Sequence, residues 1–272
     1  MNQLFIENLT NIAIKASLQA GNKILEIYKN ENYQVEYKED NSPITIADKL
    51  AHEIISATLS QTKIPILSEE GVDIPYDTRK NWNLFWLVDP IDGTKEFINR
   101  NGEFTVNIAL IENCKPIMGV IYSPVNGKIY FGSGKNAFSF ENINDYETNT
   151  EEILENIKVN KKKLPLPQNR KNFIIAASRS NLNIETINYI QSIENQQKNI
   201  ETISVGSSLK FCLVAEGIAD IYPRFSTTME WDTAAGHAIV NAAGGTVVNS
   251  INKTEMEYNK KDLKNPWFIV KK

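Results

Sequence analysis

Three apolar segments follow one another in the middle of the chain with only short breaks between them. They are FTVNIALI at 104–111, PIMGVIYSPV at 116–125 and KIYFGSG at 128–134. The last break is Asn126-Gly127, which is among the strongest short-range signals for a hairpin turn. Because connections this short join only antiparallel neighbours, the segments predict a meander of strands within one sheet.

Helix and strand patterns lie on both sides of this meander. Residues 3–29 carry apolar side chains at spacings of three and four, and the pattern starts again at about Ile46. The runs IPIL at 64–67 and LFWLV at 84–88 suit buried strands. After residue 171, strand-like runs alternate with helical patterns at 183–195, 207–216 and 233–243. Alternation after a meander predicts a layered α/β fold with mixed rather than purely parallel sheets.

The stretch 141–171 is rich in Asn, Glu and Lys and ends in KKKLPLPQNRK. It is the weakest stretch for core formation and the predicted boundary between two parts of the chain. We therefore predict two closely packed halves, 1–145 and 146–272.

The bulk composition argues against several classes of protein. The chain has 272 residues, of which 42% are hydrophobic, and a formal net charge of −4. Such a balance is typical of a soluble globular protein and argues against binding to a nucleic acid polymer, which requires clustered positive charge. No stretch approaches the ~18 apolar residues of a transmembrane segment, and the N-terminus lacks the pattern of a signal peptide. A cytoplasmic location is therefore predicted.

The chain has only two histidines, His52 and His237, which excludes a histidine-rich zinc site. Ser-His-Asp catalysis is disfavoured, because no G-x-S-x-G motif occurs and both histidines lie in helix-like stretches. The candidate chemistry therefore rests on carboxylates.

Asp89 and Asp92 follow the apolar run 84–88 directly, on either side of Pro90. Both side chains are expected at the end of a buried strand, where α/β proteins commonly bind ligands. Two carboxylates this close raise each other's pKa unless a cation compensates, and Mg²⁺ is a hard cation that prefers oxygen ligands. A solvated Asp-Pro turn explains these two residues equally well.

Three further acids lie at the ends of predicted elements. Glu69 follows the run at 64–67, Asp232 begins an apolar helix, and Asp48 lies three residues after Thr45 at the start of another helix. An N-cap explains Asp232 and a capping box explains Asp48, so each has a purely structural interpretation. Five acids at element ends nevertheless favour a metal site. With the free N–H groups of a turn at Gly93-Thr94, this pattern indicates hydrolysis of a phosphate ester.

Two longer motifs give these residues a context. Asp89 to Thr94 reads D-P-I-D-G-T and Trp231 to Gly236 reads W-D-T-A-A-G. Both resemble the hallmark motifs of the lithium-sensitive, Mg²⁺-dependent inositol monophosphatase superfamily, and the resemblance extends over nearly the whole chain. It implies a five-layered αβαβα sandwich with mixed sheets and two or three Mg²⁺ ions per active site.

The resemblance also implies roles for individual residues. The metal ligands would be Glu69, Asp89, the carbonyl of Ile91, Asp92 and Asp232, so the N-terminal half would carry most of them. Asp48 and Thr94 would activate the attacking water with help from Glu69. The N–H groups of Gly93 and Thr94 would hold the scissile phosphate.

The segments 92–111 and 205–225 are similar to the bacterial 3'(2'),5'-bisphosphate nucleotidases of the CysQ type. This closer resemblance implies removal of the 3'-phosphate of adenosine 3',5'-bisphosphate, and action on the sulfated nucleotide is a further expectation. A second phosphate requires donors of its own. The implied substrate contacts beyond the phosphate turn are Lys95, Asn181, Ser207, Lys210, Arg224 and Asp232. Asn181 stands where some relatives have a histidine, and its amide can donate to a phosphate or a hydroxyl more weakly and without charge.

Several alternatives remain open at this point. An inositol or fructose phosphatase would have the same metals and a different pocket. A haloacid-dehalogenase-type phosphatase, with Asp89 as nucleophile, or a metal-dependent binding protein are more distant alternatives. Homodimers are common in the superfamily. The sequence leaves open the oligomeric state, the number of metals and contact with the inner face of the cell membrane.

Overall fold

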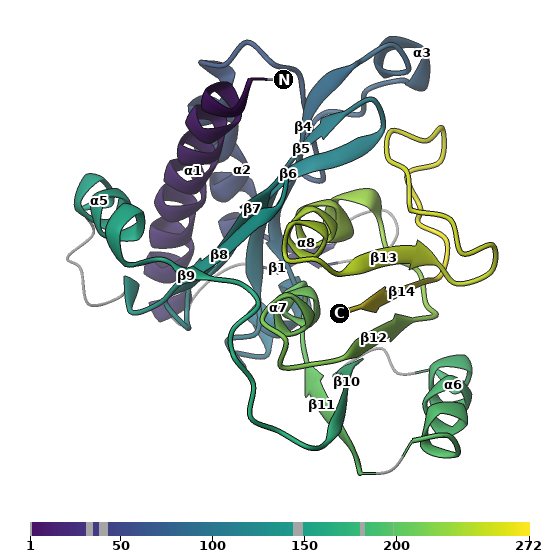
Figure 1. Cartoon of the computed structure of the whole chain (residues 1–272). Coiled ribbons are helices and arrows are strands. Elements are labelled where there is room, and N and C mark those ends of the chain that lie inside the picture. The colour runs from purple at the N-terminus through teal and green to yellow at the C-terminus, as the bar shows by residue number, and fades with distance from the viewer. Residues whose placement is uncertain (1, 31–34, 38–42, 144–148, 180–182, 198) are drawn as a thin grey trace.

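The computed structural model describes residues 2–30, 35–37, 43–143, 149–179, 183–197 and 199–272. They form five layers (Figure 1): outer helices, a seven-stranded sheet, two central helices, a five-stranded sheet and one helix on its far side. The expected five-layered αβαβα sandwich with mixed sheets is confirmed.

The helices and strands divide among these layers as follows. The helices are α1 (Gln3–Lys29), α2 (Ile46–Ser60), α3 (Tyr76–Arg79), α4 (Thr94–Ile98), α5 (Thr150–Asn160), α6 (Ile184–Glu194), α7 (Leu209–Ala215) and α8 (Glu230–Ala242). A two-stranded ribbon consists of β1 (Val35–Tyr37) and β2 (Pro43–Thr45). The large sheet contains β3 (Ile66–Ser68), β4 (Leu84–Asp92), β5 (Thr105–Glu112), β6 (Lys115–Ser123), β7 (Lys128–Ser133), β8 (Asn136–Phe140) and β9 (Lys162–Lys163). The small sheet contains β10 (Phe173–Ser178), β11 (Ile200–Val205), β12 (Ile221–Arg224), β13 (Thr246–Asn249) and β14 (Phe268–Lys271).

The predicted meander is confirmed as the centre of the large sheet, whose strand order is β3-β4-β5-β6-β7-β8-β9. Each neighbouring pair from β4·β5 to β8·β9 is antiparallel, and β3 runs parallel to β4. The loop between β5 and β6 is Asn113-Cys114, and both residues have positive φ, as tight two-residue hairpins require.

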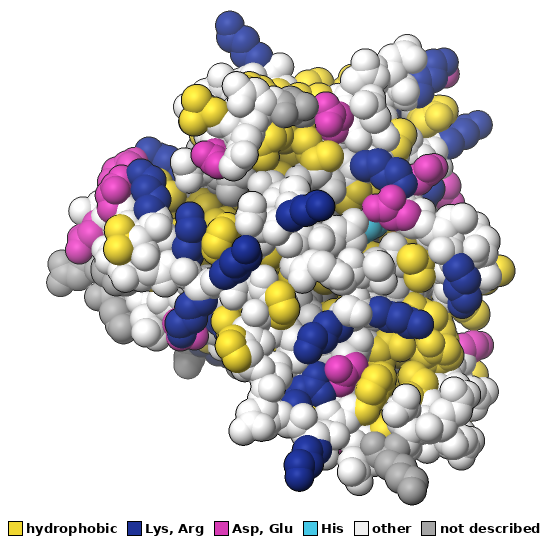
Figure 2. Space-filling view, viewed as in Figure 1, with side chains coloured by type: hydrophobic (Ala, Val, Ile, Leu, Met, Phe, Trp, Pro, Cys, Tyr) yellow, Lys and Arg dark blue, Asp and Glu magenta, His cyan; other side chains and the backbone are white. Residues whose placement is uncertain are grey.

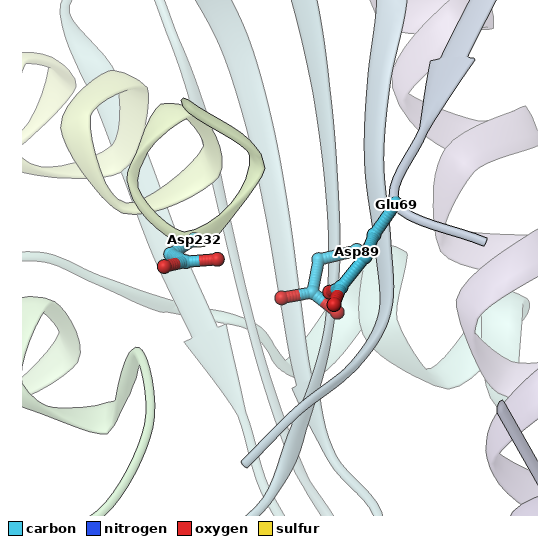
Figure 3. A group of neighbouring side chains, drawn as sticks. All are labelled: Glu69, Asp89 and Asp232. Carbon is cyan, nitrogen blue, oxygen red and sulfur yellow. The ribbon is translucent and has the colours of Figure 1, made fainter. Parts of the chain in front are cut away.

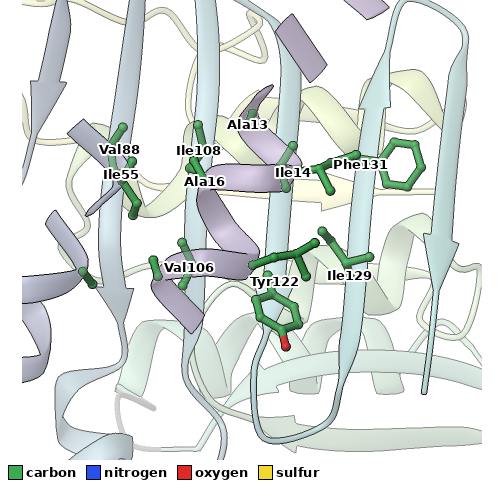
Figure 4. Packing of buried hydrophobic residues seen from close by; sticks show 14 of the residues in the cluster. Ala13, Ile14, Ala16, Ile55, Val88, Val106, Ile108, Tyr122, Ile129 and Phe131 are labelled. Carbon is green, nitrogen blue, oxygen red and sulfur yellow. The ribbon is translucent and has the colours of Figure 1, made fainter. Parts of the chain in front are cut away.

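Helices α1 and α2 pack on the outer face of the large sheet. Their apolar stripes and the facing strand residues form one core cluster, which includes Ile14, Ile55 and Val106 (Figure 4). Helix α5 joins this cluster through Ile153 and Ile157, and β9 pairs with β8. The sequence pattern predicted no helix in 141–171, the stretch expected to be weakest for core formation, yet a few apolar residues at helical spacing are enough for α5 to bury one face.

The other face of the large sheet packs against α8. A Cβ atom on Gly119 of β6 would lie 2.2 Å from the carbonyl oxygen of Ala235 in α8, so the two backbones approach as closely as glycine allows. The small sheet, with the order β11-β10-β12-β14-β13, covers α7 and α8 from the other side, and α6 closes its outer face. The central core cluster contains residues from both predicted halves of the chain. The division at residue 145 stays a prediction.

Charged and apolar side chains are interspersed on the face of the molecule shown in Figure 2. None of the helices in the described part of the chain combines the length and the apolar character needed to cross a bilayer.

Candidate active site

A cavity of about 350 Å³ opens where the end of β4, the start of α8 and the segment after β11 meet. Eleven of the residues proposed from the sequence line it. They are Glu69, Asp89, Ile91, Asp92, Gly93, Thr94, Lys95, Ser207, Lys210, Arg224 and Asp232. The fold therefore brings these residues together, whereas Asn181 lies outside the described residues.

Three carboxylates from three different elements converge in this cavity. Glu69 follows β3, Asp89 lies in β4, and Asp232 lies in the first turn of α8 (Figure 3). Each offers one oxygen, and these oxygens all lie within 4.8 Å of one another. Such a separation allows oxygen ligands from all three to share a divalent cation.

Burial and mutual repulsion disfavour the ionised carboxylates of this cluster, and a bound cation would offset both effects. Burial raises the pKa of Asp89 well above its usual value, and the negative charges of Glu69, Asp92 and Asp232 raise it further. One oxygen of Asp89, Oδ1, is buried and has no hydrogen-bond partner among the described residues. A buried, unpartnered carboxylate oxygen beside other carboxylates fits a metal ligand, since buried charges are otherwise paired.

A β-bulge explains how Asp89 and Asp92 both reach the cavity. Residues three apart on a regular strand point to opposite faces. Asp89 pairs with Asn107 and Asp92 with Thr105, so β4 uses one more residue than β5 over this interval. Burial raises the pKa of Asp92 to about 6, although the ammonium group of Lys210 acts in the opposite direction.

Asp232 has both features that the sequence suggested for it, a capping position in a helix and a carboxylate in the acidic cluster. Helix α8 begins at Glu230, earlier than predicted, so Asp232 is the third helical residue rather than the N-cap. Its Oδ2 accepts the N–H of Met229 at 2.9 Å. Burial raises its pKa well above the usual value, and the charges of Asp92 and Glu69 add to this effect. The side chain therefore caps its helix and also belongs to the acidic cluster.

Asp48 lies behind the cavity wall and contacts it through Thr94. The capping box predicted for Asp48 is confirmed, since its Oδ2 accepts the backbone N–H of Thr45 at 2.8 Å and the Thr45 hydroxyl at 2.6 Å. Its other oxygen, Oδ1, accepts the hydroxyl of Thr94 at 3.1 Å. Burial raises the pKa of Asp48, against the effect of these hydrogen bonds. Asp48, which caps α2, is therefore hydrogen-bonded to Thr94 in the cavity lining.

The turn at Gly93-Thr94 leads directly into α4. Gly93 has a φ of 94°, in the left-handed region that glycine adopts without strain. A Cβ atom there would lie 3.2 Å from Glu96 Oε2 and 3.3 Å from the Cβ of Ser207. A side chain at Gly93 would be crowded by these neighbours, and without one the backbone of Gly93 and Thr94 lines the cavity.

Two cations line the same cavity. Lys210 is buried and donates to the carbonyl oxygens of Ser207 at 2.6 Å and Val205 at 3.2 Å. Burial lowers its pKa to about 8, although the charge of Asp92 opposes the shift. Arg224 donates through Nη2 to Thr227 O at 3.4 Å, and its buried Nε has no partner within the described part of the chain. These groups form a cationic site beside the carboxylates.

Sequence reasoning missed a polar network beneath this cavity. The hydroxyl groups of Thr105 and Ser208 lie 2.7 Å apart, and Ser208 Oγ donates to Asn107 Oδ1 at 2.8 Å. The available signal was the spacing of Thr105 and Asn107, which alternate with apolar residues in 104–111 and so share one face of β5.

Neither histidine belongs to the cavity lining. His52 contacts Ser68 Oγ at 2.9 Å, and His237 is buried beside the hydroxyl of Tyr258 at 3.0 Å.

The chain is similar to proteins of known families. The model of the inositol monophosphatase family matches residues 6–270. The 3'(2'),5'-bisphosphate nucleotidase CysQ of Salmonella typhimurium is 44% identical over 256 residues, which cover 92% of this chain and 94% of that protein. The protein of the same name from Buchnera aphidicola is 46% identical, with 84% and 79% of the two chains covered.

A solved structure agrees with these relatives. The crystal structure of CysQ from Bacteroides thetaiotaomicron, described as a bacterial member of the inositol monophosphatase family, has a TM-score of 0.88 and 49% sequence identity. The alignment covers 99% of this chain and 98% of that one. Since the family match and the relatives extend over almost the whole sequence, this chain belongs to the inositol monophosphatase family.

Proposed function

We propose that this chain is a Mg²⁺-dependent 3'(2'),5'-bisphosphate nucleotidase that hydrolyses adenosine 3',5'-bisphosphate to AMP and phosphate. The relatives named CysQ support this reaction. The observation that carries the proposal is one cavity that is lined both by an acidic cluster and by the cations Lys210 and Arg224. A substrate with two phosphates would bind one phosphate at the acidic cluster, through the metal, and the other at the cations.

Magnesium would be held by Glu69, Asp89, Asp92, Asp232 and the carbonyl oxygen of Ile91. Bound Mg²⁺ lowers the pKa of water and offsets the charge that develops on the phosphate and on the leaving oxygen. Oxygen ligands are the type that this ion prefers. The unpartnered Oδ1 of Asp89 supports a bound cation at this place.

Asp48 and Thr94 would manage the proton of the attacking water. The Thr94 hydroxyl already donates to Asp48, so its lone pairs are directed away from that carboxylate. Thr94 can then accept a proton from water while it passes its own proton to Asp48, with Glu69 helping to orient the water. The water oxygen would bond to phosphorus as the bond from phosphorus to the 3'-oxygen breaks. The 3'-oxygen would take a proton from solvent, and Asp48 would release the proton that it received, so that the enzyme returns to its starting state.

The two phosphates would bind to different parts of the cavity. The N–H groups of Gly93 and Thr94 would hold the scissile 3'-phosphate. Lys210, Arg224 and Ser207 would bind the 5'-phosphate, and the free Nε of Arg224 supplies a donor for it. Lys95 is exposed at the cavity edge and is a further candidate contact. The contribution of Asn181 stays a prediction.

We extend the proposal to the related sulfated nucleotide, which carries the same 3'-phosphate. Clearing such nucleotides would serve sulfate assimilation. Lithium would inhibit the enzyme by replacing a Mg²⁺ ion. The number of Mg²⁺ ions, two or three, a homodimer and a cytoplasmic location all stay predictions of the sequence.

A comparison of three substrates tests the proposed function. The purified chain is assayed for phosphate release from adenosine 3',5'-bisphosphate, inositol 1-phosphate and fructose 1,6-bisphosphate, with Mg²⁺ and with excess chelator. We expect kcat/KM to be highest for the nucleotide and activity to require Mg²⁺. A clear preference for either sugar phosphate would show that the cavity serves the alternative substrates instead.

Replacement of the two cations tests how the nucleotide binds. Lys210→Met and Arg224→Met should each raise KM for the nucleotide by about tenfold or more, since a charged hydrogen bond to phosphate contributes about 1.5–3 kcal/mol. Lys135→Met, which changes an exposed lysine in the β7–β8 turn, is the control. An unchanged KM in both active-site variants would mean that neither Lys210 nor Arg224 binds the phosphate.

A further inference from the structure

Glu103 lies in the connection between α4 and β5, and its side chain reaches across to the small-sheet side of the molecule. Its Oε2 accepts the backbone N–H of Gly206 at 2.8 Å. The same carboxylate accepts two hydrogen bonds from the guanidinium of Arg179, from Nε to Oε2 and from Nη2 to Oε1, each at 2.7 Å. The Glu103 side chain is 19% exposed and Arg179 is about half exposed, so the pair lies at the surface and its value rests on its geometry and on the additional bond to Gly206.

Arg179 carries the connection further into the small sheet. It follows β10, and its Nη2 also donates to the carbonyl oxygen of Ser204 in β11 at 2.9 Å. Its backbone N–H donates to the carbonyl oxygen of Val205 at 3.3 Å. Arg179 therefore joins Glu103 to the end of β11, immediately before the segment that carries Ser207 and Lys210.

The carbonyl oxygen of Glu103 lies close to both Gly93 and Gly206. A Cβ atom on Gly93 would lie 3.3 Å from the Glu103 carbonyl oxygen, and a Cβ atom on Gly206 would lie 2.9 Å from it. Ser207, next to Gly206, has a φ of 45°, which is uncommon for a residue other than glycine and persists only where neighbours hold it. Glu103 thus lies against the Gly93-Thr94 turn and against Gly206, which precedes the segment from Ser207 to Lys210.

The charge state of Glu103 suits this role. Burial raises its pKa, but the hydrogen bonds from Arg179 and Gly206 outweigh burial and hold the pKa below its usual value. The carboxylate is therefore ionised at neutral pH. Bidentate contacts between arginine and carboxylate fix direction as well as distance.

We propose that Glu103, together with Arg179, is a positioning residue that sets the separation between the Gly93-Thr94 turn and the segment from Ser207 to Lys210. This inference rests on the proposed function, because that separation is then the distance between the two phosphates of the substrate. Glu103 touches neither phosphate. It acts by holding the donors of the second phosphate at a fixed distance from the first.

The variants Glu103→Gln and Arg179→Met test whether these residues position the two sites or only stabilise the fold. Glutamine keeps the shape of Glu103 and loses its charge, while Arg179 is about half exposed, so its replacement leaves the core intact. Kinetics are measured for adenosine 3',5'-bisphosphate and for adenosine 3'-monophosphate, which lacks the second phosphate. Glu26→Gln removes an exposed ion pair with Lys23 on α1 and serves as the matched control.

We expect both variants to raise KM for the bisphosphate by about tenfold and to lower its kcat by less than about threefold, as misplaced binding groups do. The ratio of kcat/KM between bisphosphate and monophosphate should therefore fall. Arg179→Lys should restore part of the loss, because lysine keeps the charge without the bidentate geometry.

Three results would overturn the inference in different ways. If the wild-type chain does not prefer the bisphosphate over the monophosphate, the proposed function fails and the inference fails with it. If the wild type has that preference and Glu103→Gln lowers kcat equally for both substrates, Glu103 supports the fold only. If the variant has the kinetics of the wild type for both substrates, Glu103 does not set the separation of the two sites. A thermal unfolding scan of each variant identifies a loss of folded enzyme, which would lower kcat for both substrates and leave KM unchanged.

Discussion

The hydroxyl of Thr94 donates to the carboxylate of Asp48 at 3.1 Å, although 46 residues separate the two in sequence. The same carboxylate caps α2 by accepting both the N–H and the hydroxyl of Thr45. The helix cap therefore fixes the orientation of Asp48, and Asp48 in turn orients the Thr94 hydroxyl. The two groups of the proposed proton relay are therefore held in a fixed orientation, as general-base catalysis requires.

Thr94→Val tests this relay. Valine keeps the shape of threonine and removes the hydroxyl, so we expect kcat to fall by about 10²–10⁴-fold, the usual contribution of a positioned acid–base group. Thr94→Ser retains the hydroxyl and should retain most of the activity. Steady-state kinetics at saturating Mg²⁺ check both variants, and a Thr94→Val enzyme within a few-fold of the wild type would contradict the relay.

Asp89→Asn should separate metal binding from stability. The amide removes a buried negative charge from a cluster of carboxylates, so without metal we expect the variant to be at least as stable as the wild type. Mg²⁺ at 100 times its Kd should stabilise the wild type by about 2.7 kcal/mol and the variant far less. Thermal unfolding with chelator and with Mg²⁺ measures both effects.

The control for this experiment is Asp77→Asn, which changes an exposed acid that pairs with Lys80. It should respond to Mg²⁺ as the wild type does. An equal Mg²⁺-induced shift in Asp89→Asn and the wild type would mean that Asp89 is not a ligand.

Gly119→Ala tests the close packing of α8 on the large sheet. The added Cβ atom would lie 2.2 Å from the carbonyl oxygen of Ala235, and both atoms belong to rigid elements. We expect the free energy of unfolding to fall by about 1–3 kcal/mol or more. Gly134→Asn is the control, because Gly134 has no neighbour within 4 Å and asparagine tolerates its φ of 58°. Urea unfolding compares the two, and equal stability would refute the close approach.

Asp220 should make stability depend on pH in the acid range. Burial raises its pKa, but hydrogen bonds from Arg170 and from the N–H of Ile174 more than offset this, so its pKa lies below the usual value. A depressed pKa in the folded state contributes stability above the unfolded-state pKa of about 3.9, and that contribution is lost as pH falls further.

Asp220→Asn checks the sign of this effect. We expect the variant to be less stable than the wild type at pH 7 by about 1 kcal/mol, since the pair is partly exposed and screened. The difference should shrink as the pH is lowered below about 4. Urea unfolding at pH 7 and pH 3.5 measures it. A difference that stays constant over this interval would rule out the ionised Asp220 as its source.

Local patterns in the sequence predicted much of the fold. The turn at Asn126-Gly127, the apolar stripe of 3–29 and the capping box of Thr45 and Asp48 all depend on residues close together in the chain, and the structure confirms each. Local patterns failed where a signal was weak, as in α5. They also placed the end of β4 at residue 88, whereas the strand continues through a bulge to Asp92 because β5 pairs with it there.

The sequence alone determined which acids are available and, through its motifs, the family to which they belong. Only the tertiary structure decided that oxygens of Glu69, Asp89 and Asp232 lie within 4.8 Å of one another, and that Glu103 reaches Gly206 across 103 residues. The physical reason is that capping and turns are governed by neighbouring residues, whereas the meeting of distant side chains depends on how the sheets and helices pack. A bulge in β4 and the close approach of α8 to β6 set those positions, and neither can be read from residues near each other in sequence.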